Sequence, residues 1–138
     1  MELLATPTSA YLLQASLEVL HYENREWQEE ITFIQDEVRF LHRLYAKFAD
    51  KYLPNKQDQA AAQLQEKLFA FTAEVHNLRR MVDEHEHYLA DIMQQKKYVS
   101  DAEYRRTHQR VKLLVEALFN ELKQLKKALF QWTEAVLS

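Results

Sequence analysis

A chain of 138 residues is the size of one domain and is long enough to bury a continuous core. With no glycine and only two prolines, Pro7 and Pro54, it has few residues that break helices, so a few long helices are favoured. The missing glycine excludes glycine-rich phosphate-binding loops, the missing cysteine excludes disulfides and thiolate chemistry, and a net charge of −3 gives no overall attraction to nucleic acid.

The N-terminal segment has neither the basic start nor the unbroken apolar run of a secretion signal. No stretch of the chain approaches the ~18 consecutive apolar residues that would span a bilayer. We therefore expect a cytoplasmic protein without a cofactor, a membrane partner or a nucleic-acid partner.

The first third of the chain carries apolar residues in alternating steps of four and three, the heptad pattern of a packed helix. This pattern predicts a helix over residues 9–53. Pro54 ends it, because a proline disfavours helical geometry in the residue before it. The predicted core positions are Leu13, Leu17, Leu20, Asn24, Trp27, Ile31, Ile34, Val38, Leu41, Tyr45, Phe48 and Tyr52.

The middle of the chain repeats the heptad pattern and predicts a second helix over residues 56–97. Asn55 is a suitable N-terminal cap, and Asp58 would then lie in the first turn. The predicted core positions are Leu64, Leu68, Phe71, Val75, Leu78, Val82, His85, Leu89 and Ile92.

A third heptad pattern predicts a helix over residues 101–137. Ser100 and Glu103 have the spacing of a capping box, in which each side chain accepts a backbone N–H of the other residue. The predicted core positions are Tyr104, His108, Val111, Val115, Leu118, Leu122, Leu125, Leu129, Trp132 and Val136.

Both predicted connections are short, which makes neighbouring helices antiparallel. The sequence therefore predicts an all-α fold: an elongated, antiparallel, up-down-up three-helix bundle with coiled-coil-like heptad packing, forming a single domain over residues 1–138.

Three core positions are polar, namely Asn24, His85 and His108. Matching positions across turns centred near residues 55 and 99 places Asn24 level with His85, and His108 one layer away, near Leu20 and Leu89. A buried polar layer of this kind fixes the register of a bundle. A half-buried imidazole could instead bind a ligand or titrate between about pH 5 and 8, and both interpretations stay open.

A metal site is the alternative function, because Glu84 and His87 have the Glu-x-x-His spacing of di-iron bundles and Glu18 and His21 repeat it. Against this, the heptad places Glu84 and His87 outward, and the third helix offers no carboxylate at a core position. The residues of this alternative site are His21, His85, His87, His108 and Glu84. No catalytic constellation is recognisable, so an enzyme is not expected.

More aromatic residues flank the core positions than a closed three-helix bundle needs. The flanking rings that predict an interface are those of Phe33, Phe40, Phe69, Phe119 and Phe130. Turn matching brings Phe40, Phe69 and Phe130 near one layer, and exposed apolar patches usually mark interfaces. The sequence therefore predicts a non-enzymatic structural or interaction protein that forms a homo-oligomer or binds a partner helix.

Overall fold

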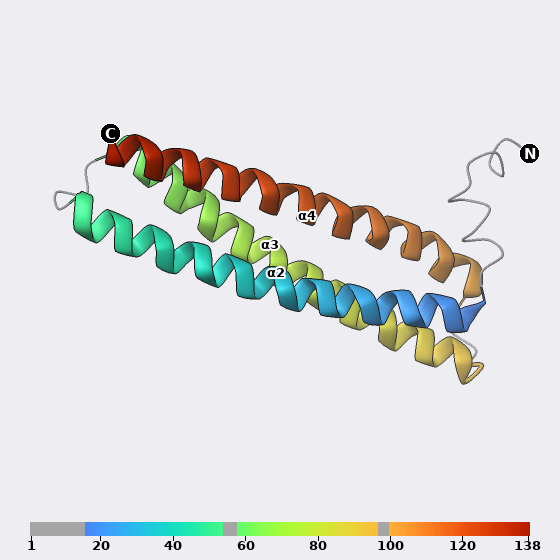
Figure 1. Cartoon of the computed structure of the whole chain (residues 1–138). Coiled ribbons are helices and arrows are strands. Elements are labelled where there is room, and N and C mark those ends of the chain that lie inside the picture. The colour runs from blue at the N-terminus through green and yellow to red at the C-terminus, as the bar shows by residue number, and fades with distance from the viewer. Residues whose placement is uncertain (1–15, 54–57, 97–99) are drawn as a thin grey trace, which may run out of the picture. The chain divides into compact units, whose positions relative to one another are not determined.

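A computed structural model describes residues 16–53, 58–96 and 100–138. Within these ranges the chain forms three helices and no strand: α2 (Leu17–Tyr52), α3 (Gln59–Met93) and α4 (Asp101–Leu137) (Figure 1). The predicted all-α three-helix bundle is confirmed. In the part of the chain that the structure describes, no helix is long and apolar enough to cross a membrane.

The first two helices begin behind a side chain that accepts a backbone N–H. The Ser16 hydroxyl accepts the N–H of Val19 before α2, and an Asp58 carboxylate oxygen accepts the N–H of Ala60 before α3. Asp58 therefore precedes α3 as its cap and does not lie in its first turn. The predicted start at residue 9, the cap Asn55 and the terminator Pro54 lie outside the described residues.

The end of α3 differs from the prediction. The helix ends at Met93, so the predicted end at residue 97 is wrong. Gln95 adopts the left-handed conformation (φ 57°), and the N–H of Lys96 donates to the carbonyl of Asp91. This turn closes the helix as a glycine usually does, although a side chain at positive φ costs about 1–2 kcal/mol.

The start of α4 is the predicted one, with one change in the capping box. The Ser100 hydroxyl accepts the N–H of Glu103 at 3.2 Å, as predicted. The N–H of Ser100 donates to the Tyr88 hydroxyl at 3.0 Å, so α3 supplies the acceptor that a complete capping box takes from the glutamate.

Replacing Ser100 with alanine should lower the free energy of unfolding by about 1 kcal/mol, because the N–H of Glu103 loses its acceptor. Urea unfolding followed by circular dichroism measures this change. The variant Ser100→Asp serves as control, since aspartate also accepts this bond and should restore most of the loss. Unchanged stability in Ser100→Ala would show that this cap contributes nothing.

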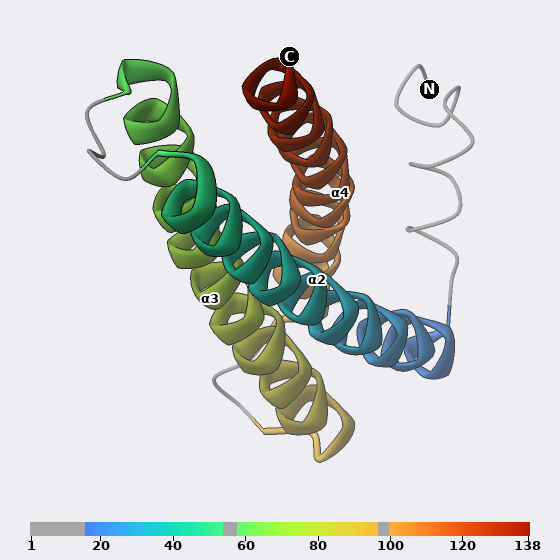
Figure 2. The ribbon, with the colours of Figure 1, turned by 60° about the vertical axis from the view of Figure 1, so that its left-hand side comes forward.

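The described residues form two compact units, and each helix contributes a segment to both (Figure 2). The first unit comprises the described residues of Met1–Glu30 and Leu78–Glu116, and the second comprises those of Ile31–Asn77 and Ala117–Ser138.

In the first unit α3 runs antiparallel to α2, since the side chain of Asn24 bonds to Glu86 and that of Gln28 bonds to Asp83. The core contains both apolar and polar side chains. Leu20 and Leu89 pack against Tyr104 in one apolar cluster. The other buried apolar residues of this unit are Trp27, Leu78, Val82, Val111 and Val115.

The second unit has the same up-down-up order. The side chain of His42 bonds to Thr72 of α3, and Lys126 of α4 forms an ion pair with Glu37. Its buried side chains all lie at predicted heptad positions except Ala61. They are Ile31, Ile34, Val38, Leu41, Ala61, Leu64, Leu68, Phe71, Val75, Leu118, Leu122, Leu125, Leu129 and Trp132.

Candidate functional site

The polar core positions meet inside the first unit. Asn24 of α2, His85 of α3 and His108 of α4 are the polar side chains that the structure buries among the residues it describes. Each helix contributes one of them, so the layer lies between all three. Burying a polar group lowers stability unless the group is hydrogen-bonded, so the cost of this layer depends on its hydrogen-bond partners.

The two histidines and a glutamate form a continuous hydrogen-bonded chain. His85 Nε2 lies 2.8 Å from His108 Nδ1, and His108 Nε2 lies 2.9 Å from a carboxylate oxygen of Glu23. A carboxylate only accepts, so His108 Nε2 carries the proton of that bond. Nδ1 of a neutral His108 is then an acceptor, and His85 Nε2 must be its donor. The arrangement therefore fixes the tautomer of both rings.

Aromatic side chains enclose this chain. The ring of Tyr104 stacks on His85 with centroids 4.1 Å apart and planes 4° from parallel. Trp27 lies against His108 with centroids 4.5 Å apart. These contacts hold the imidazoles in place.

Burial keeps both imidazoles neutral. Burial, together with a smaller effect of the neighbouring His108, lowers the pKa of His85 from 6.5 to about 3. Burial also lowers the pKa of His108, although the hydrogen bond and the charge of Glu23 oppose this shift. Lys112 and Arg105 add to the lowering. At neutral pH the site is thus two neutral rings in series, ending on a carboxylate.

Asn24 forms a second branch of the network. Its amide nitrogen donates to the Tyr104 hydroxyl at 2.8 Å and to Glu86 at 3.1 Å, and the other oxygen of Glu86 lies 2.6 Å from His21. Burial raises the pKa of Tyr104, which therefore remains a phenol. The Asn24 carbonyl oxygen is buried without a partner, a cost that apolar residues at this position would not incur.

Three members of the network were not predicted as site residues from the sequence. Tyr104 was predicted only as a core position, and Glu23 and Glu86 were not among the predicted site residues. Both glutamates are next to a polar core position, Glu23 before Asn24 and Glu86 after His85. This adjacency of charge and buried polar side chain was the signal that could have identified them.

The register between α3 and α4 differs by one layer from the prediction. His108 lies level with His85, and Leu20 and Leu89 pack against Tyr104 instead. The prediction placed the second turn near residue 99. Because α3 already ends at Met93, the turn is centred earlier and the facing positions shift by about one helical turn.

Of the residues of the metal alternative, the structure brings His85 and His108 together and leaves the others apart from them. Glu84 and His87 are exposed, as the heptad predicted, and His21 pairs with Glu86. Among the described residues, no group of three or more His, Cys, Asp or Glu side chains could hold a metal ion. This finding counts against a di-metal centre.

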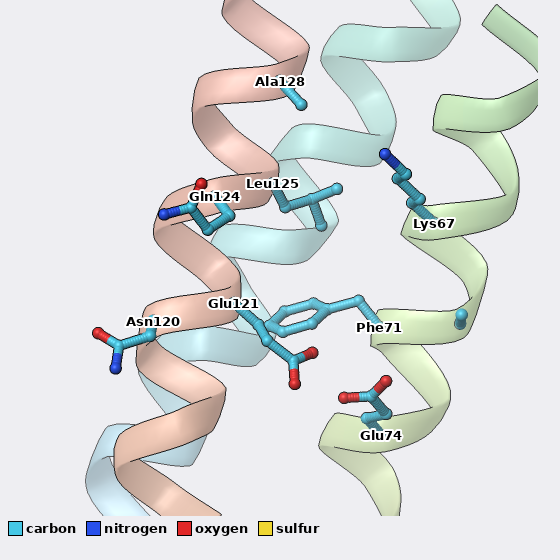
Figure 3. A pocket seen from close by; sticks show the side chains of 9 residues that line it. Lys67, Phe71, Glu74, Asn120, Glu121, Gln124, Leu125 and Ala128 are labelled. Atoms are coloured by element: carbon cyan, nitrogen blue, oxygen red, sulfur yellow. The ribbon is translucent and has the colours of Figure 1, made fainter. Parts of the chain in front are cut away.

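A pair of glutamates lies at a pocket of the second unit. This pocket, between α3 and α4, has a volume of about 370 Å³, and Phe71 and Leu125 line it. The carboxyl groups of Glu74 and Glu121 face each other beside it (Figure 3). A hydrogen bond that protonated Glu121 donates to Glu74, partial burial and the charge of Glu74 raise the pKa of the Glu121 carboxyl group to about 6. The pair therefore binds a proton in weak acid.

Four of the five predicted interface phenylalanines are exposed: Phe33 at 52%, Phe40 at 47%, Phe69 at 61% and Phe130 at 43%. Phe119 is half-buried. All five belong to the second unit.

The ion pair between Glu37 and Lys126 shows how these rings are placed. Residues three, four or seven apart share a helix face. Phe33 and Phe40 therefore share the face of α2 that carries Glu37, and Phe119 and Phe130 share the face of α4 that carries Lys126. We call these four rings the α2–α4 aromatic face.

Phe69 lies elsewhere. Its ring is 5.4 Å from that of His42, which also bonds to Thr72 of α3. His42 follows the buried Leu41, whereas Glu37 precedes the buried Val38, so the two lie on opposite sides of the α2 core stripe. Phe69 therefore flanks the groove between α2 and α3.

The comparisons with known proteins do not assign these features to a family. No protein-family model, no curated protein and no solved structure matches the chain. The function is therefore inferred from the geometry of the two units alone.

Proposed function

We propose that this protein is a non-enzymatic helical bundle that forms a homodimer through the α2–α4 aromatic face. The supporting observation is that three half-exposed phenylalanines and one half-buried phenylalanine flank a single interhelical ion pair. Exposed rings on one face are an unfavourable surface in water, and a partner surface that covers them removes this cost.

A second copy of the chain is the partner that this face fits best. A two-fold interface brings the same surface of both copies together, so it must be complementary to itself. The α2–α4 aromatic face suits this condition, because its central charges, Glu37 and Lys126, neutralise each other.

The expected affinity is modest. Covering the exposed half of each phenylalanine ring contributes about 1 kcal/mol, and association itself costs several kcal/mol. We therefore expect a dissociation constant between about 10 µM and 1 mM. Such a dimer forms at high protein concentration or where the chain is locally concentrated.

The test is a charge introduced into the face. Phe40→Glu combined with Phe130→Glu should abolish the dimer while the helical content stays unchanged. Multi-angle light scattering measures the mass, and circular dichroism checks the fold. The matched control is Phe69→Glu, because Phe69 is at least as exposed but flanks the other groove, so this variant should still dimerise.

Two results would contradict the proposal. A wild-type protein that stays monomeric at about 1 mM removes its basis. Dissociation by Phe69→Glu together with an unaffected double variant would place the interface in the groove between α2 and α3. If a peptide helix binds the face and the protein itself does not dimerise, the partner is a helix of another protein.

A further inference from the structure

A small pocket opens over the histidine chain of the first unit, between α3 and α4. Its volume is about 190 Å³, and its walls include Met81, Glu84, His85, Tyr88, Glu103 and Tyr104. Because a water molecule occupies about 30 Å³ in the liquid, the space suits a ligand of up to about six heavy atoms. The chemistry of the walls shows which ligand that is.

His85 presents an unused ring nitrogen at this pocket. The residue is only 5% exposed, and its hydrogen bond to His108 is the one that it makes within the described residues. That bond uses Nε2–H, so Nδ1 carries a free lone pair. Among the described residues, the buried side-chain atoms without a partner are Asn24 Oδ1 and Trp132 Nε1. His85 Nδ1 is not one of these atoms, so it is not fully buried. Because His85 lines the pocket, this nitrogen can accept a hydrogen bond from a ligand there.

The walls around His85 are aromatic. The rings of Tyr88 and Tyr104 are nearly parallel, with centroids 5.9 Å apart, and both line the pocket. The face of a tyrosine ring attracts cations. Met81 adds an apolar, adaptable side chain that packs against an alkyl group.

The charged residues of the pocket are acidic. Glu84 and Glu103 line it and are exposed, and its lining residues include neither lysine nor arginine. A complete capping box would bind the Glu103 carboxylate to the N–H of Ser100. Here the Tyr88 hydroxyl accepts that N–H, which leaves the Glu103 carboxylate available to a ligand.

We propose that this pocket binds a small organic ammonium ion. An N–H of the ligand donates to His85 Nδ1, its charge lies near Glu84 and Glu103, and its alkyl part packs against Met81 and the tyrosine rings. A metal ion fits less well, because the described residues offer no set of three ligating side chains. Binding also extends the hydrogen-bonded chain, which then runs from the ligand through His85 and His108 to Glu23.

The test compares isobutylamine with isobutanol, which has the same shape but no charge. At about pH 8 the amine is an ammonium ion and both histidines are neutral. In protein labelled with ¹⁵N at histidine, the amine should shift the ring nitrogen signals of His85 and His108 saturably, with a dissociation constant of about 1 mM. The alcohol should bind at least about tenfold more weakly.

The variants test the roles of the pocket residues. Glu84→Gln combined with Glu103→Gln should weaken binding of the amine about tenfold and leave binding of the alcohol unchanged. Both side chains are exposed, so the fold should tolerate the change. The matched control is Glu116→Gln, an exposed position of the same unit that does not line the pocket, and it should bind the amine as the wild type does.

Three outcomes would overturn the proposal. One is the absence of saturable shifts at about 10 mM amine. Another is equal binding of the amine and the alcohol, which would show an apolar crevice without selectivity for charge. The third is an amine affinity that is the same in the double glutamine variant as in Glu116→Gln.

Discussion

Lowering the pH from about 6.5 toward 3 should destabilise this protein through its two buried histidines. In the unfolded chain an imidazole binds a proton below about pH 6.5. In the folded protein burial holds the pKa of His85 at about 3 and also lowers that of His108. Between these values the unfolded state binds more protons than the folded state, so the free energy of unfolding falls as the pH falls.

The effect has an upper limit and an opposing contribution. Each buried histidine contributes at most about 1.4 kcal/mol per pH unit within its own window. Glu121 and Glu30 have raised pKa values, so the folded state binds protons more readily at these residues. Their contribution to the free energy of unfolding is present in acid and is lost as the pH rises. For Glu121 it is lost as the pH rises through its pKa of about 6. Glu121 is exposed and Glu30 is half-buried, so solvent screening keeps this contribution small.

Urea unfolding at a series of pH values measures the slope. Replacing Trp132 with phenylalanine leaves Trp27, which lies against His108, as the only tryptophan and thus the fluorescent reporter of the first unit. The control is the same protein with His85→Leu and His108→Leu, in which the loss of stability between about pH 6.5 and 4 should be much smaller. Equal slopes in the two proteins would show that these histidines do not cause acid sensitivity.

The loss of unfolding free energy caused by His85→Leu and His108→Leu together should be smaller than the sum of the losses caused by each substitution alone. His85→Leu leaves the buried Nδ1 of His108 without its donor, and His108→Leu leaves the N–H of His85 without its acceptor. Each unpaired group costs about 1–3 kcal/mol. The double variant removes both groups, while Glu23 keeps its access to water, so its loss should be at least about 1 kcal/mol smaller than the sum of the single losses.

A double-mutant cycle at about pH 8, where both rings are neutral, measures this coupling without protonation effects. The control cycle pairs His85→Leu with Arg110→Ala, an exposed position of α4, and its two effects should add. Additive effects in the histidine cycle as well would mean that the 2.8 Å contact contributes no interaction energy.

The sequence by itself determined the helices and their buried stripes. The steps of four and three residues place these side chains on one face of each helix, and burying that face against the other helices removes its apolar surface from water. Leu20, Ile34, Val82 and Leu129 are buried where the heptad placed them. The same pattern places three polar residues, Asn24, His85 and His108, on the buried faces. Each helix buries the apolar residues before and after them on that face, so these polar side chains are buried too.

The tertiary structure decided which buried groups meet. The register between α3 and α4 depends on where α3 ends, and a left-handed glutamine with its hydrogen-bonded turn sets that end, which no heptad encodes. The hydrogen bond that His108 donates to Glu23 joins residues 85 positions apart, so local periodicity carries no information on it. Local periodicity also does not place Phe69 relative to Phe40 and Phe130. Phe69 lies apart from them because α3 packs along one side of the α2 core stripe and α4 along the other.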